Sequence, residues 1–136
     1  MVILNQITIY VGKMKINKVI GFINKHLEKY NCNVFAILSL DIAMDEILSN
    51  ILSYAYKTAC GTVTIKYDLF ENNVIMKFID SGIQYNPVCS EDPDVGLSIK
   101  YRKEGGLGIY LVKKQIDSIE YEYINNKNIL TIKKHI

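Results

Sequence analysis

Five stretches of the chain alternate between apolar and polar residues, and alternation with a period of two is typical of β-strands. Turn-forming residues separate the stretches in the middle of the chain and also those near its end, so each pair predicts a β-hairpin. One turn is Glu71–Asn72–Asn73 and the other is Asn125–Asn126–Lys127. The predicted strands are residues 3–11, 62–69, 74–79, 118–124 and 128–134.

Three other stretches carry apolar residues at intervals of three and four, which is the spacing of an α-helix with one buried face. The first spans residues 16–30 and is broken by Asn31–Cys32–Asn33. The second, from about Val34 to Lys57, is apolar on most of its circumference, which predicts a helix that is largely buried. The third begins at Leu107.

No sustained period covers the segment from Asp80 to Glu104, which contains both prolines of the chain. Long irregular loops are uncommon inside a compact domain, and many of them are functional lids or binding loops. We therefore predict a lid over about residues 83–104. The elements together predict one α+β domain over residues 1–136, with helices on one face of a largely antiparallel sheet.

Length and charge narrow the class of protein. The chain has 136 residues and a formal net charge of +2, which gives no indication of a nucleic-acid or membrane surface. Its three cysteines are widely separated, a pattern that favours neither a disulfide framework nor a zinc site. Without a signal peptide or an apolar stretch near the length of a membrane span, a cytoplasmic location is expected.

Two polar residues stand out on the long helix. Glu46 and Asn50 are four positions apart, so they project from one face on successive turns, among mostly apolar neighbours. A partly buried carboxylate can accept a proton, and an amide oxygen is a suitable ligand for Mg²⁺. The same positions also fit a polar stripe that faces solvent together with Asp41, Asp45 and Ser49.

Asp80–Ser81–Gly82 lies where a strand meets the predicted lid. A carboxylate held at the end of a strand can accept a hydrogen bond from an amino group such as that of adenine. Gly82 would let the backbone approach a flat ring without a Cβ clash. An ordinary turn is the other interpretation, because these residue types are frequent in turns.

The third candidate is Gly105–Gly106–Leu107–Gly108, at the start of the last predicted helix. Free N–H groups and the positive end of the helix dipole make such a start favourable for phosphate oxygens. A dinucleotide-binding fingerprint is excluded because no strand runs directly into these glycines. A Walker A loop is excluded because the glycines are not followed by Lys and then Ser or Thr.

Taken together, these motifs resemble those of the GHKL ATPase superfamily, which has the Bergerat fold, and within it the RsbW-like anti-sigma factor serine kinases. The segment 45–50 resembles the N box, with Tyr54 at a position where His is frequent. The segment 80–87 resembles the G1 box, 105–109 the G2 box, and 128–132 the closing strand. The resemblance extends over nearly the whole chain.

The resemblance implies a two-layer fold with a mixed, mostly antiparallel sheet, three helices on one face and a long ATP lid. It implies ATP and Mg²⁺ as cofactors, with Glu46 as general base and Asn50 as the metal ligand. Asp80 and Gly82 would hold adenine, and Thr131 would support the pocket beside Asp80. The four residues Gly105, Gly106, Leu107 and Gly108 would lie near the phosphates.

The implied function is anti-sigma regulation by a protein serine/threonine kinase. Its substrate would be an anti-anti-sigma protein with a STAS domain, and its other partner would be a sigma factor. The protein would form a homodimer and would not contact nucleic acid or membrane directly. Glu104 stands where the family often has a basic residue, so a nucleotide-gated binding switch without phosphotransfer remains an alternative. A detached histidine-kinase domain is disfavoured, because His26 lacks the Arg and Pro expected after a phosphoacceptor histidine.

Overall fold

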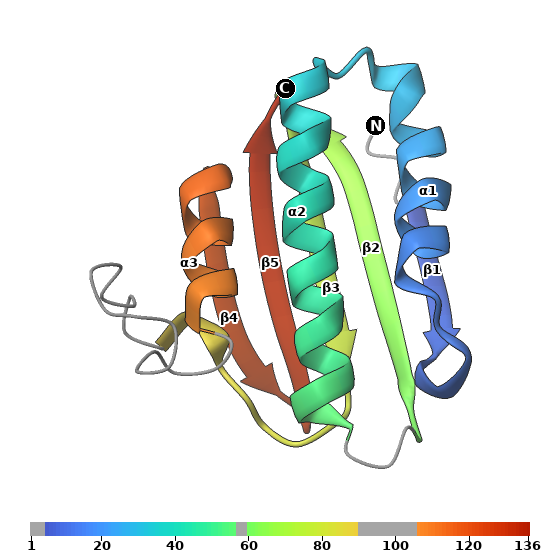
Figure 1. The fold of residues 1–136 in the computed structure, drawn as a ribbon, viewed down its shortest axis with the longest axis vertical. Coiled ribbons are helices and arrows are strands. Elements are labelled where there is room, and N and C mark those ends of the chain that lie inside the picture. The colour runs from blue at the N-terminus through green and yellow to red at the C-terminus, as the bar shows by residue number, and fades with distance from the viewer. Residues whose placement is uncertain (1–4, 57–59, 90–105) are drawn as a thin grey trace.

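The computed structural model describes residues 5–56, 60–89 and 106–136, which form a two-layer α+β domain (Figure 1). Three helices, α1 (Ile16–Leu27), α2 (Val34–Asn50) and α3 (Gly106–Gln115), cover one face of a five-stranded sheet. The strands, in the order in which they pair, are β1 (Asn5–Tyr10), β2 (Thr62–Phe70), β3 (Asn73–Asp80), β5 (Lys127–His135) and β4 (Ser118–Ile124). The predicted fold class is thereby confirmed.

Every pair of neighbouring strands among the described residues is antiparallel, whereas the family resemblance implied a mixed sheet. The reason lies in the last hairpin. The chain crosses from β3 through α3 to the outer strand β4 and then returns through β5. Because β5 is the inner strand of this hairpin, it runs antiparallel to β3.

Asparagine-rich turns close both hairpins. Glu71 and Asn72 have φ values of 50° and 61°, and Asn125 and Asn126 have 54° and 62°. Two successive residues with positive φ match the twist of a two-residue hairpin, and asparagine tolerates this region better than most residues do. The turns are shorter than predicted, since Asn73 and Lys127 already belong to the strands.

The first helix ends earlier than its apolar spacing predicted. Regular helical geometry stops at Leu27, and a 3₁₀ turn covers Glu28–Tyr30. Asn31 then adopts a left-handed conformation with φ 53°, which breaks the chain direction as predicted. The side chain of Asn33 accepts a hydrogen bond from the N–H of Ala36 at 2.8 Å and so caps the start of α2.

The long helix α2 runs across the middle of the helical layer (Figure 1). Its residues Leu40, Met44 and Leu48 have no exposed surface, as predicted. Its outer face is exposed, contrary to the prediction of a largely buried helix: Val34, Phe35, Leu38 and Ile42 are between 45% and 77% exposed. The α-helix ends at Asn50, and a π-helical turn follows over Ile51–Ala55, so the predicted single helix to Lys57 has a wider last turn. Residue 57 lies outside the described residues.

The hydrophobic core lies between the helices and the sheet. Strands contribute every second residue to it, as in Val63, Ile65 and Tyr67 of β2, which are at most 1% exposed. The opposite face of the sheet carries no helix in the described part of the chain. None of the described helices is both long and apolar enough to cross a membrane.

The cap of α2 generates a stability prediction. Replacing Asn33 by Ala removes the acceptor for the Ala36 N–H, and we expect the free energy of unfolding to fall by about 1 kcal/mol. Chemical denaturation followed by circular dichroism measures this change. Asn33→Ser is the matched control, because serine also caps helices, and it should retain most of the stability. A loss as large as that of Asn33→Ala would contradict the capping role.

Candidate nucleotide site

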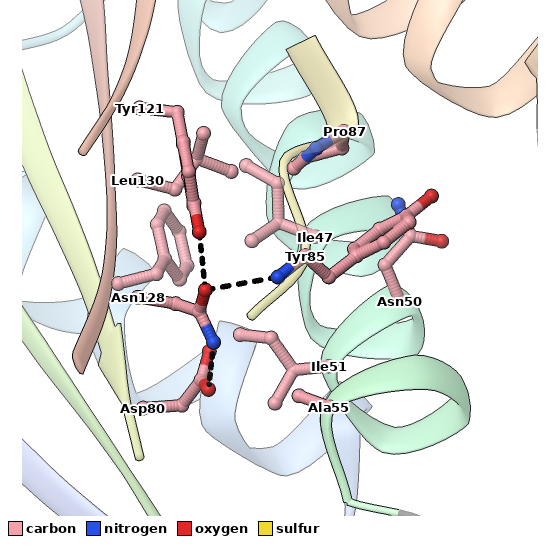
Figure 2. Close-up of a pocket in the computed structure, with 11 residues that line it drawn as sticks. Ile47, Asn50, Ile51, Ala55, Asp80, Tyr85, Pro87, Tyr121, Asn128 and Leu130 are labelled. Atoms are coloured by element: carbon pink, nitrogen blue, oxygen red, sulfur yellow. Dashed lines mark hydrogen bonds between the residues drawn. The ribbon is translucent and has the colours of Figure 1, made fainter. Parts of the chain in front are cut away.

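A cavity lies between the C-terminal half of α2 and the ends of the central strands (Figure 2). One wall comes from α2 and its π-helical turn, and the other comes from β3, β4 and β5. The segment after β3 lies across the cavity between them. The lining residues are Ile47, Asn50, Ile51, Ala55, Phe78, Asp80, Tyr85, Pro87, Tyr121, Asn128 and Leu130.

Asp80 is the last residue of β3, and its side chain points to the helical side of the sheet. Its carboxylate is buried, with 5% of the residue exposed. Oδ1 accepts hydrogen bonds from the N–H of Gly82 at 2.9 Å and from Nδ2 of Asn128 at 2.8 Å. Burial raises the pKa of Asp80, and these two hydrogen bonds partly offset that effect. Within the described residues, Oδ2 has no hydrogen-bond partner.

Asn128 lies directly opposite Asp80 in the sheet and holds the polar end of the cavity together. Its Oδ1 accepts from the N–H of Tyr85 at 3.1 Å and from the hydroxyl of Tyr121. Its Nδ2 donates to Asp80 Oδ1 and to the carbonyl of Ile83 at 3.0 Å. All four hydrogen-bonding positions of the amide are therefore used, and their partners lie on three other segments: β3, β4 and the residues after β3.

Asn128 was not predicted as a site residue, and Thr131 was predicted in its place. The structure corrects this. Asn128, Leu130 and Ile132 face the helices, and all three are buried. Thr131 alternates to the other face of the sheet, opposite Lys77. A signal for Asn128 was present in the sequence, because it is a polar residue in a position that alternates with buried apolar residues.

Gly82 packs directly against the π-helical turn. A Cβ atom at this position would overlap the carbonyl group of Ala55, so any larger residue would push the two segments apart. The next residue, Ile83, donates its N–H to the same carbonyl at 2.9 Å. The close approach that the sequence suggested for Gly82 is therefore made to the protein's own backbone.

Tyr56 joins the turn to the strands below it. Its hydroxyl accepts a hydrogen bond from the N–H of Ser81 at 2.7 Å and donates one to the carbonyl of Thr62 at 2.9 Å. The residue is 9% exposed. The backbone on either side of Gly82 is thus fixed, by Tyr56 at Ser81 and by Ala55 at Ile83.

Glu46 and Asn50 lie on consecutive turns of α2, and they face the start of α3 and the cavity. A Cβ atom at Gly108 would overlap the Glu46 carboxylate, so the two residues are in direct contact. Burial is the main cause that raises the pKa of Glu46, and the charge of Asp45 raises it further, whereas Asn50 lowers it. Asn50 is 8% exposed and lines the cavity.

The remaining predicted phosphate-binding residues are only partly described. Gly106 and Leu107 are the first two residues of α3, and Gly108 is the third. Gly105, Glu104 and the predicted lid from residue 90 onward lie outside the described residues. The described beginning of the lid contains a 3₁₀ turn over Pro87–Cys89.

Two tyrosines stack at the mouth of the cavity. The rings of Tyr54, on the π-helical turn, and Tyr85, on the segment after β3, have centroids 5.1 Å apart and planes 26° apart. Tyr85 and Asn50 both line the cavity. An aromatic residue at position 54 therefore contacts the segment after β3, which was not predicted from the sequence.

The family resemblance implies Mg²⁺, and the side chains around the cavity can be compared with the ligands that this ion needs. No three acidic, histidine or cysteine side chains gather to hold a metal in the described ranges. Mg²⁺ in nucleotide sites needs no such cage, because phosphates and water supply most of its ligands. The buried amide of Asn50 offers one oxygen in the right chemical class, and therefore the residues fit a metal that arrives with a nucleotide.

This chain is similar to known proteins over most of its length. The profile described as histidine kinase-like ATPase domain matches residues 13–134. Serine-protein kinase RsbW of Bacillus mycoides (strain KBAB4) is 28% identical over 98 residues, which cover 69% of this chain and 61% of that relative. The protein of the same name from Bacillus cereus (strain B4264) is 29% identical over 101 residues, covering 71% of this chain and 63% of the relative. The match thus spans about three fifths of the length of these relatives.

The hydrogen bonds of Asn128 generate a prediction about charge. Asn128→Asp replaces the amide that donates to Asp80 by a second carboxylate in the same buried space. We expect the free energy of unfolding to fall by about 3 kcal/mol or more at neutral pH. The pKa of the new carboxyl must be raised by burial and by Asp80. The loss should therefore shrink as the pH falls through that raised pKa, and urea denaturation between neutral and mildly acidic pH measures it. A loss independent of pH would contradict the charge explanation.

Proposed function

The chain belongs to the histidine kinase-like ATPase domain family, and we propose that it binds Mg·ATP in this cavity and transfers the γ-phosphate to a serine or threonine of a partner protein. One observation carries the proposal. Asn50 of α2 and Asp80 at the end of β3 line one cavity, and Glu46, one turn of α2 before Asn50, contacts Gly108 at the start of α3. The alternative interpretation of Glu46 and Asn50 as a solvent-facing stripe does not explain the burial of Asn50.

Adenine would occupy the end of the cavity at Asp80. Oδ1 is engaged by Asn128 and Gly82, and Oδ2 is the atom that can accept a hydrogen bond from the exocyclic amino group of adenine. Apolar side chains such as Ile51 and Leu130 line the walls, as expected of a pocket for a flat ring. Gly82, which is held against Ala55, would form the edge of this pocket.

The phosphates would lie toward α3. Asn50 is one turn further along α2 than Glu46, so the adenine end and the reacting end follow each other along one helix. The first N–H groups of α3 have no partner within the helix, and the positive end of the helix dipole favours the phosphate charge. Asn50 would hold Mg²⁺, which neutralises charge on the phosphates when it is bound.

Glu46 would act as the general base. Its carboxylate takes the proton of the partner's hydroxyl group, the hydroxyl oxygen bonds to the γ-phosphorus, and the bond from that phosphorus to the β-γ bridging oxygen breaks to release ADP. A base works best when its pKa approaches the working pH, and burial raises the pKa of Glu46 in this direction. Transfer of this kind depends mainly on positioning and charge neutralisation.

The identity of the partner rests on the relatives. Proteins named serine-protein kinase RsbW match most of this chain, which supports a serine kinase. We propose a STAS-domain anti-anti-sigma protein as the substrate and a sigma factor as the second partner, with the protein acting as a homodimer in the cytoplasm. Phosphorylation would then determine which partner the protein holds. In a nucleotide-gated switch, by contrast, ATP would change partner binding without any transfer.

Two substitutions on α2 separate binding from transfer. Glu46→Gln keeps the size of the side chain but removes the base, and we expect phosphorylation of a STAS-domain partner to fall by about 10²- to 10⁴-fold. Asn50→Ala should abolish the Mg²⁺-dependent part of ATP binding. Radiolabelled ATP measures the transfer, and a fluorescent ATP analogue with and without Mg²⁺ measures the binding.

The outcomes distinguish the candidate functions. Full transfer by Glu46→Gln would reject Glu46 as the base. Tight binding of ATP by the unmodified protein with no label on any STAS partner would favour the nucleotide-gated switch. Absence of ATP binding would reject both.

Asp80 offers a test in which stability and binding respond differently. Asp80→Asn keeps an oxygen that can accept from Gly82 and Asn128, but it places an amide where adenine would need an acceptor. We expect ATP affinity to fall about tenfold or more, because the buried polar groups of the pocket lose their partner. Thermal unfolding should not occur at a lower temperature, since the substitution removes a charge that burial disfavours. A variant that binds ATP normally would rule out the adenine contact.

A further inference from the structure

A second groove lies at the edge of the sheet farthest from α3, between β1 and α1. Apolar side chains from both elements line it, and Phe22 of α1 is 46% exposed there. Ile7 and Ile9 of β1 are only half-buried, although they face the helical layer. The complete lining is Ile7, Ile9, Lys13, Lys15, Lys18, Val19 and Phe22.

The groove is strongly basic. Lys13, Lys15 and Lys18 are all exposed, and in the described part of the chain none of them forms a salt bridge. The first acidic residue of the sequence is Glu28, so residues 1–27 contain four lysines and no acid. This segment carries a charge of +4 in a chain of net charge +2, which leaves −2 for the remainder. The positive charge is thus concentrated around the groove.

The strand beside the groove is an unprotected edge. β1 pairs with β2 on one side, and no described strand pairs with its other side. Natural edge strands are commonly blocked by charged residues, proline or a bulge. The sequence of β1, Asn5–Tyr10, contains neither a charged residue nor a proline, and its six residues pair with β2 in continuous register.

We propose that this groove binds an extended acidic segment of a partner protein, which adds a strand to β1. Backbone hydrogen bonds to the open side of β1 would hold the segment, as in other cases of strand addition. Apolar side chains on the face of the segment toward the helices would contact Phe22 and Ile9. Acidic residues at the end of the segment that extends past Tyr10 would meet the lysines that follow β1 in the chain. A second copy of this chain would bring no acidic residue from the corresponding segment, because residues 1–27 contain none.

This surface does not depend on the proposed nucleotide site, so it is tested without ATP. The probe is a fluorescein-labelled peptide with alternating valine and threonine at its centre and glutamates at both ends, titrated with the full chain at low salt. We expect saturable binding, measured by fluorescence anisotropy, that weakens as salt is added. A peptide N-methylated on alternate residues lacks the donors for strand addition, and it should not bind.

A charge-reversed variant with a matched control locates the site. The triple variant Lys13→Glu, Lys15→Glu, Lys18→Glu should bind the peptide about tenfold or more weakly. The control is the triple variant Lys77→Glu, Lys127→Glu, Lys133→Glu. It changes the net charge by the same amount, at exposed positions on the sheet face that carries no helices. The control should bind the peptide as tightly as the original chain does. Amide chemical shifts in the original chain should change most in β1.

Four results would overturn the proposal. Two concern the peptides: no binding of the alternating peptide up to millimolar concentration, or unchanged binding of the N-methylated peptide. The other two are equal losses of peptide affinity in both triple variants, and stronger binding of a duplex DNA oligonucleotide through the same lysines. Circular dichroism confirms that the variants are folded. Because ATP is absent throughout, failure here leaves the proposed kinase function untouched, and failure of ATP binding leaves this surface untouched.

Discussion

A buried carboxylate is tolerated only where hydrogen bonds replace the water that it loses, and Asn128 supplies one such bond to Oδ1 of Asp80. Asp80 sits at the end of a central strand with one oxygen held by Asn128 and Gly82. Asn128 in turn receives a tyrosine hydroxyl from β4 and a backbone N–H from the segment after β3. The position of the cavity follows from this network, because it joins three strands and a loop at one point.

The second wall of the cavity is the buried face of α2. This helix packs across the centre of the sheet with one face buried, whereas Phe35, Leu38 and Ile42 on its outer face are exposed. Glu46 and Asn50 point toward α3 and the cavity. The rigid helix sets the spacing between them, while contact with Gly108 ties the position of Glu46 to the first turn of α3.

The elements of the fold were predictable because their signals are local. The period of Val63, Ile65 and Tyr67 predicts a strand without knowledge of its neighbours, and the same holds for the helical spacing of α2. The grouping of Glu46, Asn50 and Asp80 came from the family resemblance. Asn128 and the misplacement of Thr131 show the limit. The alternation of polar and apolar residues indicates which β5 residues face the helices, but the pairing that sets Asn128 opposite Asp80 joins strands that α3 and β4 separate in the chain, so no local pattern fixes it. The π-helical turn was equally unpredictable, since it arises from packing around Gly82 and Ala55.

That π-helical turn links the two walls of the cavity. The carbonyl of Ala55 accepts the N–H of Ile83, so the end of the long helix and the backbone that follows Asp80 share a hydrogen bond. Sliding of α2 along its axis would pull on Ile83 and, through Asn128, on β5. The helix α2 and the ends of β3 and β5 are therefore mechanically coupled. A displacement of α2 along its axis would be transmitted to the cavity through these hydrogen bonds.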